Sequence, residues 1–259
     1  MMRLQELTLN NTTFPHAETI EQLRQNIATI RERIDQACLQ AGRDPKEVRL
    51  LPVSKTHPAE FLRLAYAAGC RMLGENKVQE AQQKWQELQD LKDLEWSVIG
   101  HLQTNKAKYV ARFASEFHAL DSLRLAEALD QRLTIEDRYL DVLVQINTSG
   151  EESKYGINPE QAPELIAQLG QFKRLRVRGL MTLAMNSEDT EAVRGCFVQL
   201  RELRDSLQAN APEGMQLTEL SMGMSGDFEI AIAEGATIVR IGQAIFGARE
   251  QPDSYYWPK

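Results

Sequence analysis

Residues 48–55, V-R-L-L-P-V-S-K, form a short apolar run without helical periodicity, and the run ends at Lys55. The residues that follow, T-H-P-A-E, are typical of the start of a helix, with Pro58 suited to its first turn. A short apolar run bounded in this way predicts a buried β-strand. Lys55 then stands at the carboxyl end of a strand, where α/β folds place their functional residues. The alternative is a solvated lysine that merely ends the strand.

The rest of the chain repeats this alternation of strand and helix. Further strands are predicted at 71–74, 96–100, 116–120, 141–147, 177–183, 219–222 and 238–242. Helices are predicted at 58–68, 78–91, 106–113, 122–132, from 159 onward, at 190–208 and at 228–234. Such alternation gives a parallel sheet, and eight units close a barrel. We therefore predict an α/β fold, a single (β/α)8 TIM barrel.

An open, doubly wound sheet is the competing architecture. It would require a glycine-rich G-x-G-x-x-G turn after the first strand, because that turn binds the phosphates of a dinucleotide. The sequence at this point, V-S-K-T-H, contains no glycine. The barrel is therefore the better interpretation.

A long amphipathic helix is predicted at residues 18–41, ahead of the first strand. Its apolar side chains recur at steps of three and four, at Ile20, Leu23, Ile27, Ile30, Ile34 and Ala37. This stripe could form a dimer seam, but we expect the extra helix to pack on its own barrel and the protein to be a monomer. Residues 1–17 show no periodicity and are predicted to be a loose arm. The domain organisation is then an arm at 1–17 and one barrel domain at 18–259.

Composition and charge restrict the classes of partner. The 259 residues are 42% hydrophobic and 26% charged, as in an average globular protein, and the net charge is −7. An acidic chain is poorly suited to nucleic acid or anionic membranes, which require a basic surface. The three cysteines, Cys38, Cys70 and Cys196, lack the spacing of metal ligands. We expect a cytoplasmic protein with reduced thiols, no metal site and no membrane association.

If the barrel forms, the residues that follow each strand gather at one face, around an apolar mouth. The first five units contribute Lys55, Glu75, Asn76, His101, Gln103, Asp121, Asn147 and Lys154. The last three units contribute Met181, Thr182, Met224, Ser225, Gly226, Arg240, Gly242 and Gln243. Two histidines are expected elsewhere, with His57 facing water and His118 packed or hydrogen-bonded within its strand.

The loops after the seventh and eighth strands indicate a phosphate site. M-G-M-S-G-D-F and R-I-G-Q-A-I-F-G each place small residues before a short helix. Backbone N–H groups at such helix starts attract anions, and TIM barrels commonly bind phosphate at these two loops. Ser225 adds a hydroxyl donor, while Gly226 and Gly242 allow close approach of the backbone. The alternative is that these glycines only form tight turns.

A lysine facing a phosphate site suggests a Schiff base with a phosphorylated aldehyde. A lysine amine attacks a carbonyl only when it is neutral, and a partly desolvated site favours that form. Pyridoxal 5′-phosphate (PLP) carries both an aldehyde and a phosphate. A Schiff-base sugar-phosphate aldolase would use the same pair of groups, so spacing alone leaves both open.

Several motifs in order resemble one family. They are L-L-P-V-S-K-T, M-L-G-E-N-K-V-Q-E-A, W-S-V-I-G-H-L-Q-T-N-K, L-M-T-L-A, S-M-G-M-S-G-D-F-E-I-A-I and V-R-I-G-Q-A-I-F-G. Together they resemble the pyridoxal phosphate homeostasis protein family (the YggS/PROSC type), which is similar to the N-terminal barrel of alanine racemase. The resemblance runs from about residue 48 to 247 and covers every barrel unit.

The resemblance implies PLP bound covalently as a Schiff base on Lys55. It also implies a phosphate held by Ser225 and by the backbone of Gly226, Gly242 and Gln243, with Arg240 against the pyridine nitrogen. Lys154 matches the place of a racemase arginine near the phenolic oxygen of the cofactor. The complete expected cofactor-binding set is Lys55, Asn76, His101, Lys154, Met181, Ser221, Met224, Ser225, Gly226, Arg240, Gly242 and Gln243, with no catalytic and no metal-binding residue.

Arg240 bears on the chemistry of that site. A guanidinium has only donors, so a pyridine nitrogen beside it must accept and remain unprotonated. That makes the ring a weaker electron sink than a pyridinium.

The racemase also uses a tyrosine from a C-terminal domain, and we expect the twelve residues after 247 to be unable to supply such a domain. The sequence thus predicts a PLP carrier that buffers or delivers the cofactor, with PLP-dependent apo-enzymes as recipients.

Three other functions stay open at this point. A racemase-like or decarboxylase enzyme on the same scaffold would turn over an L-amino acid. A sugar-phosphate aldolase would never contain PLP. A regulatory adaptor would act through partner contacts, with the helix at 18–41 as the surface to test.

Overall fold

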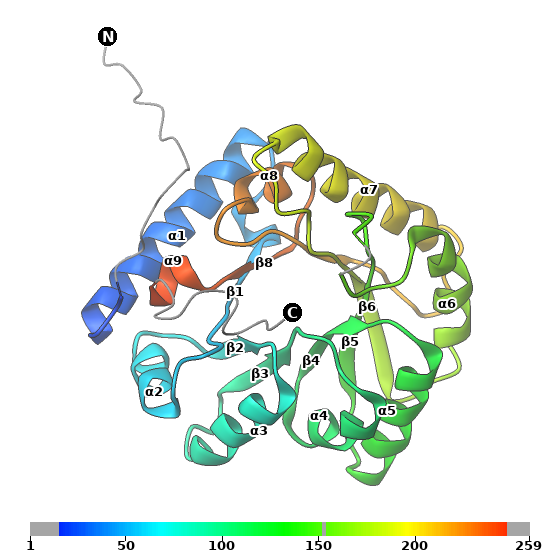
Figure 1. The fold of residues 1–259 in the computed structure, drawn as a ribbon, viewed down its shortest axis with the longest axis horizontal. Coiled ribbons are helices and arrows are strands. Elements are labelled where there is room, and N and C mark those ends of the chain that lie inside the picture. The colour runs from blue at the N-terminus through cyan, green and yellow to red at the C-terminus, as the bar shows by residue number, and fades with distance from the viewer. Residues whose placement is uncertain (1–15, 152–153, 248–259) are drawn as a thin grey trace.

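The computed structural model describes residues 16–151 and 154–247, and within them eight strands form a ring surrounded by helices (Figure 1). The strands are β1 (Arg49–Pro52), β2 (Met72–Glu75), β3 (Glu95–Val98), β4 (Glu116–Leu120), β5 (Leu140–Gln145), β6 (Leu175–Met181), β7 (Glu219–Ser221) and β8 (Ile238–Ile241). The α-helices are α1 (Ile20–Gln40), α2 (Ala59–Ala67), α3 (Val78–Glu87), α4 (Ala107–Phe113), α5 (Leu123–Ile135), α6 (Ala162–Leu169), α7 (Thr190–Gln208), α8 (Phe228–Ala233) and α9 (Gln243–Phe246). Short 3₁₀ helices lie at η1 (Pro45–Glu47), η2 (Thr104–Lys106) and η3 (Pro159–Gln161).

The sheet is parallel throughout and its strand order is β1-β8-β7-β6-β5-β4-β3-β2. At the seam between β1 and β2, the described backbone contacts are a bridge between Val53 and Gly74 and a hydrogen bond from Ser54 N to Gly74 O (3.0 Å). The ring of eight parallel strands with intervening helices confirms the predicted (β/α)8 barrel.

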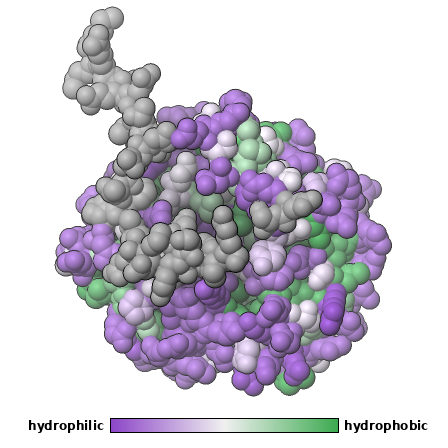
Figure 2. Space-filling view, viewed as in Figure 1, coloured by the Kyte–Doolittle hydropathy of each residue, from purple (hydrophilic) through white to green (hydrophobic). Residues whose placement is uncertain are grey.

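Apolar side chains from the strands and from the inner faces of the helices make one continuous core. Leu51, Leu73, Phe117 and Leu220 are completely buried on their strands. Polar side chains cover most of the outer surface on the face shown in Figure 2. This division follows from parallel strands that carry helices outside them, because both faces of the sheet are then removed from water.

The predicted N-terminal helix is α1, and it packs against α8 and α9. Thr19 caps it through a reciprocal pair of hydrogen bonds with Gln22. Its apolar stripe, including Leu23, Ile27 and Ile34, is buried. The amide of Asn26 donates to Ile245 O in α9 (2.8 Å), so α1 is fixed next to the loop after β8.

Element boundaries differ from the predicted ones by a few residues. α7 has the predicted bounds, whereas α3 ends at Glu87 because a turn at Leu88 replaces its last predicted residues. Most of the predicted arm, residues 1–15, and the tail 248–259 lie outside the described residues. Ala17 is buried and its N–H donates to Phe246 O (3.3 Å).

Within residues 16–151 and 154–247, no helix is both long enough and apolar enough to cross a membrane. The same residues contain no group of three or more His, Cys, Asp or Glu side chains arranged to hold a metal ion.

Candidate functional site

Parallel strands place all their carboxyl ends at one mouth of the barrel, and the predicted site residues gather there. Lys55, Asn76 and His101 follow β1, β2 and β3, and Lys154 lies in the loop after β5. The remaining candidates come from the last three units: Met181 ends β6, Ser221 ends β7, Met224, Ser225 and Gly226 follow β7, Arg240 lies in β8, and Gly242 and Gln243 follow β8. The structure therefore brings the predicted set to one end of the barrel.

Lys55 is half-buried in a tight turn between β1 and α2. His57 N donates to Ser54 O across this turn (3.2 Å). Thr56 adopts a left-handed backbone conformation, with φ of 72°. A β-branched residue rarely takes this conformation, so the turn depends on its surroundings for support.

A group of charged side chains contacts this turn; Glu75 and Lys84 are buried and Glu80 is partly buried. Lys84 of α3 donates through Nζ to Glu75 Oε1 (2.7 Å), Glu80 Oε1 (2.6 Å) and Ser54 O (3.1 Å). Ser54 Oγ also donates to Glu75 Oε1 (2.7 Å), and Thr56 N donates to Glu80 Oε1 (2.7 Å). Burial raises the pKa of Glu75 to about 7, against the lowering effect of the Lys84 charge. We call Glu75, Glu80 and Lys84 the buried charge cluster.

The loop after β7 is built on glycine and backbone contacts. Gly223 has φ of 92°, and a Cβ there would lie 2.7 Å from the Cβ of Ala231. Asp227 accepts from Met224 N through Oδ1 (2.6 Å), which closes the turn before α8. Ser225 is half-buried, while Met224 and Gly226 are exposed at the rim.

The loop after β8 lies directly against the end of the strand that leads to Lys55. A Cβ on Gly242 would lie 3.1 Å from Val53 O, and Val53 N donates to Ile241 O (2.8 Å). Gly242 O accepts from Ile245 N (3.0 Å) and from Phe246 N (2.9 Å), which starts α9. The second expected phosphate loop and the lysine strand are therefore neighbours.

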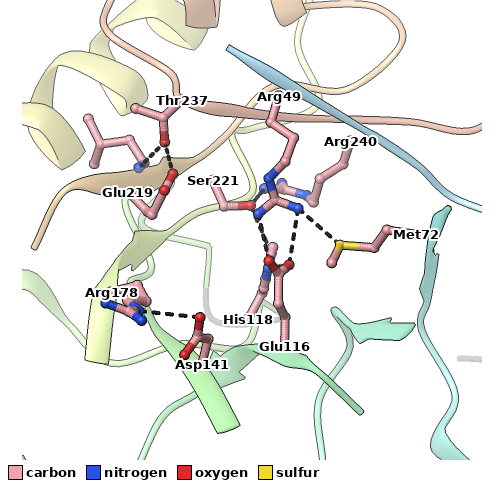
Figure 3. Close-up of polar contacts among 11 residues, drawn as sticks. Arg49, Met72, Glu116, His118, Asp141, Arg178, Glu219, Ser221, Thr237 and Arg240 are labelled. Carbon is pink, nitrogen blue, oxygen red and sulfur yellow. Dashed lines mark hydrogen bonds and ion pairs between the residues drawn. The ribbon is translucent and has the colours of Figure 1, made fainter. Parts of the chain in front are cut away.

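Arg240 is buried inside the barrel and takes part in a polar chain that crosses it (Figure 3). Its guanidinium donates to Ser221 Oγ (2.7 Å) and to Thr182 O (2.8 Å). Ser221 Oγ lies 3.0 Å from His118 Nδ1, and His118 Nε2 lies 2.9 Å from Glu116 Oε2. We call Arg240, Ser221, His118 and Glu116 the interior chain.

The chemistry of these groups sets the direction of the interior chain. The Glu116 carboxylate only accepts, so His118 donates to it from Nε2. In a neutral imidazole Nδ1 then accepts the Ser221 hydroxyl proton, while Ser221 Oγ accepts from Arg240. Burial lowers the pKa of His118, which favours the neutral imidazole. Although burial alone would raise it, hydrogen bonding with His118 and Arg49 lowers the pKa of Glu116 to about 2.

The far end of the interior chain borders a cavity at the opposite mouth of the barrel. Arg49 donates to Glu116 Oε1 (2.7 Å), and these two line a space of about 210 Å³ with Asp141, Arg178 and Glu219. Arg178 pairs with Asp141 at 3.3 Å (Figure 3). The two arginines pair with two of the three carboxylates, and the group lies at the amino ends of the strands, where barrels are stabilised and substrates are not bound.

The remaining candidates have identifiable partners at the rim. His101 stacks on Tyr155 with the ring centroids 4.1 Å apart, and its Nδ1 lies 3.2 Å from Asp121 Oδ2. Lys154 Nζ donates to Ala184 O (2.7 Å) and pairs with Glu151 Oε2 (2.8 Å). Asn76 packs by its backbone against Gly100, where an added Cβ would lie 2.2 Å from Asn76 O.

The expectations for two histidines had opposite outcomes. His118 is hydrogen-bonded in the barrel, as predicted. The prediction that His57 faces water was wrong. Its ring packs against Phe61 and Phe246, with centroids 4.9 and 5.4 Å away, and stacks on His16 at 5.6 Å. This burial, together with the nearby His16 and Lys84 charges, lowers the pKa of His57 to about 4.

Sequence reasoning missed Glu80 and Lys84. A signal was present: Val78, Ala81 and Lys84 share the buried face of α3, so a lysine occupies an apolar stripe. Its partner Ser54 lies in a different unit of the barrel, and no local pattern links the two.

Comparison with known proteins identifies the family. The alanine racemase N-terminal domain family matches residues 19–250. A protein of Aquifex aeolicus, named pyridoxal phosphate homeostasis protein, is 45% identical over 226 residues, which are 87% of this chain and 98% of that one. The chain belongs to the pyridoxal phosphate homeostasis protein family. The resemblance inferred from the motifs is confirmed.

Solved structures agree with this assignment. PipY of Synechococcus elongatus with PLP bound is 38% identical, has a TM-score of 0.76, and is matched over its whole length by 87% of this chain. Alanine racemase of Clostridium difficile is 16% identical with a TM-score of 0.68, and the match covers 61% of that enzyme. The second likeness shows the barrel fold alone.

Proposed function

We propose that this protein binds PLP as a Schiff base on Lys55 and serves vitamin B6 homeostasis by holding, buffering or delivering the cofactor. The observation that carries the proposal is the contact between two loops. The carbonyl oxygen of Val53, two residues before Lys55, lies 3.1 Å from the point where a Cβ on Gly242 would be. A lysine that follows β1 and a glycine-opened backbone loop beside that strand suit a ligand that carries both an aldehyde and a phosphate.

The residues at the mouth fit the chemistry of PLP. PLP supplies an aldehyde carbon that a neutral lysine amine attacks. Ser225 and the backbone of Gly226, Gly242 and Gln243 would hold the phosphate. Asn76, His101, Lys154, Met181 and Met224 would surround the ring.

Arg240 would lie against the ring nitrogen, and the interior chain would hold it there. Ser221, although buried, acts through Arg240, since its hydroxyl lies between that guanidinium and His118. Because Arg240 can only donate, a nitrogen facing it must stay unprotonated. This arrangement favours a carrier over an enzyme that stabilises carbanions, as the names of the curated relatives also suggest.

The first test is a visible absorption spectrum of the purified protein before and after PLP is added. We expect the wild type to be yellow, or to become so, and Lys55→Ala to lack the band of the lysine-bound cofactor. Lys77→Ala, at an exposed lysine next to Asn76, is the matched control and should retain the band. A wild type that stays colourless in excess PLP would refute the proposal and favour the aldolase interpretation.

A second assay separates a carrier from an enzyme. Loaded protein is mixed with a PLP-dependent apo-enzyme, and recovery of that enzyme's activity reports delivery. In parallel, L-amino acids are offered alone. Transfer without turnover supports the carrier, whereas steady turnover that depends on Lys55 would establish the racemase-like alternative. Light scattering of the same samples tests the expected monomer.

A further inference from the structure

The buried charge cluster holds the residues on both sides of Lys55. Lys84 is a lysine with 6% of its side chain exposed, and its ammonium faces three acceptors, one for each of its three N–H donors. One acceptor is the Ser54 carbonyl, immediately before Lys55. The Glu80 carboxylate, itself bonded to Lys84, accepts the Thr56 N–H, immediately after Lys55.

The turn that these bonds hold is conformationally strained. Thr56 has a Cβ and a branched side chain, yet its φ is 72°. Left-handed conformations are unfavourable for such residues and persist only where several contacts enforce them. The bonds to Ser54 and Thr56 are contacts of this kind, and they fix the direction in which the Lys55 side chain leaves the backbone.

The same cluster lies at the joint between β1 and β2. β1 pairs with β8 at four positions, whereas its described backbone pairing with β2 is one bridge and one adjoining hydrogen bond. Ser54 continues β1 and Glu75 ends β2, and Lys84 binds both of them from α3. The cluster thus ties both edges of the seam next to Lys55.

We propose that Lys84 is a positioning residue for PLP capture: with Glu75 and Glu80 it holds the left-handed turn at Thr56 and so aims Lys55 into the mouth. This role rests on the function proposed above. A buried ion pair adds little stability compared with apolar residues of the same size, so stability alone gives a weak reason for a lysine here.

The first experiment needs no cofactor. Amide hydrogen exchange over residues 54–57 is measured in the PLP-free protein for wild type, Lys84→Met and Glu80→Ala. We expect exchange at Thr56 to rise roughly tenfold in both variants, because a left-handed threonine is unfavourable by about that factor once its support is lost. Glu80→Gln, which keeps an acceptor oxygen, should exchange like the wild type. Unchanged exchange in Glu80→Ala would overturn the proposal even if Lys84→Met fails to fold.

The second experiment measures PLP binding and its rescue. Lys84→Met should bind PLP roughly tenfold more weakly, and adding Thr56→Gly should restore most of the affinity, because glycine adopts positive φ freely. Arg63→Met, on neighbouring α2, removes an exposed ion pair with Asp90 and should bind normally. A loss that Thr56→Gly leaves unchanged would show a merely structural role and refute the proposal. If the wild type takes up no PLP, the proposed function fails, while the exchange experiment still tests the turn.

Discussion

The two sides of the barrel mouth are built by different means. On the lysine side, residues 54–57 include no glycine, and the buried charge cluster holds their backbone. On the glycine side, the loops at 223–227 and 242–243 form their turns with Gly223, Gly242, backbone hydrogen bonds and one side-chain acceptor, Asp227 Oδ1.

The difference follows from what each side would present in the proposed function. A phosphate is bound by backbone N–H groups, and glycine lets the backbone approach it closely. A Schiff base requires a side chain at a set position, so the lysine side uses residues with a Cβ and must support them from outside. Glycine loops should therefore be sensitive to added atoms, and the lysine loop to lost contacts.

The largest effect is expected from Gly223→Ala. The new Cβ would lie 2.7 Å from the Cβ of Ala231 and 2.9 Å from Cα of Phe228, at a φ of 92°. We expect a loss of about 3 kcal/mol in the free energy of unfolding, from the clash and the left-handed backbone together. Urea denaturation measures it. Gly226→Ala, where nothing lies within 4 Å of the new Cβ, should stay within about 0.5 kcal/mol of wild type.

Ser221→Ala tests the buried support of the glycine side. It removes the acceptor of an Arg240 N–H and the partner of His118 Nδ1. Leaving such groups unpaired should destabilise the protein by about 2 kcal/mol. Ser225→Ala should show the opposite pattern, with nearly normal stability and weaker PLP binding. If both variants lost stability equally, the distinction between the interior chain and the rim would be wrong.

Acid should lower the stability of the protein through His57, which lies on the lysine side. Its pKa is about 4 when folded and 6.5 in its ordinary state, so below pH 6.5 the unfolded chain binds the extra proton. The contribution of His57 to the free energy of unfolding is fully present at neutral pH, and it is lost as the pH falls from 6.5 to 4. Between pH 7 and pH 5, His57→Phe should lose about 2 kcal/mol less stability than wild type, by urea denaturation. Parallel pH profiles for the two proteins would contradict the burial of His57.

The smallest effect is expected from Gly242→Ala. The added Cβ would meet Val53 O at 3.1 Å, so β8 and β1 need to separate only slightly. We expect a roughly threefold weaker affinity for PLP and little change in stability, because the backbone yields by a few tenths of an ångström. Fluorescence titration with PLP gives the affinity. A loss of PLP affinity as large as that expected for Lys84→Met would mean that the two sides of the barrel mouth are equally rigid.

The architecture could be predicted because it depends on local patterns. Apolar runs mark the strands, and the stripe of α1 and the bounds of α7 follow from helical spacing. Parallel topology then gathers the residues after each strand at one mouth, so the candidate set could be placed without knowing any contact.

Contacts between distant units could not be predicted in this way. His57 was expected to face water because it stands at the start of a helix, yet Phe246 from the last unit packs against it. Lys84 lies in an apolar stripe, but nothing near it in sequence indicates Ser54. The interior chain joins β4 to β7 and β8, on opposite sides of the barrel, and only closure of the sheet brings His118 to Ser221.

The pairing of β1 with β8 has a consequence for synthesis of the chain. Most of the backbone partners of the strand that leads to Lys55 are made last, and contacts so distant in sequence form late because closing a long loop is entropically unfavourable. We expect nascent chains that end before Ile238 to leave β1 open to protease, and chains that include α9 to protect it. The site for the cofactor would then come into being only when the barrel closes, so a partly made chain could not withdraw PLP from the cell.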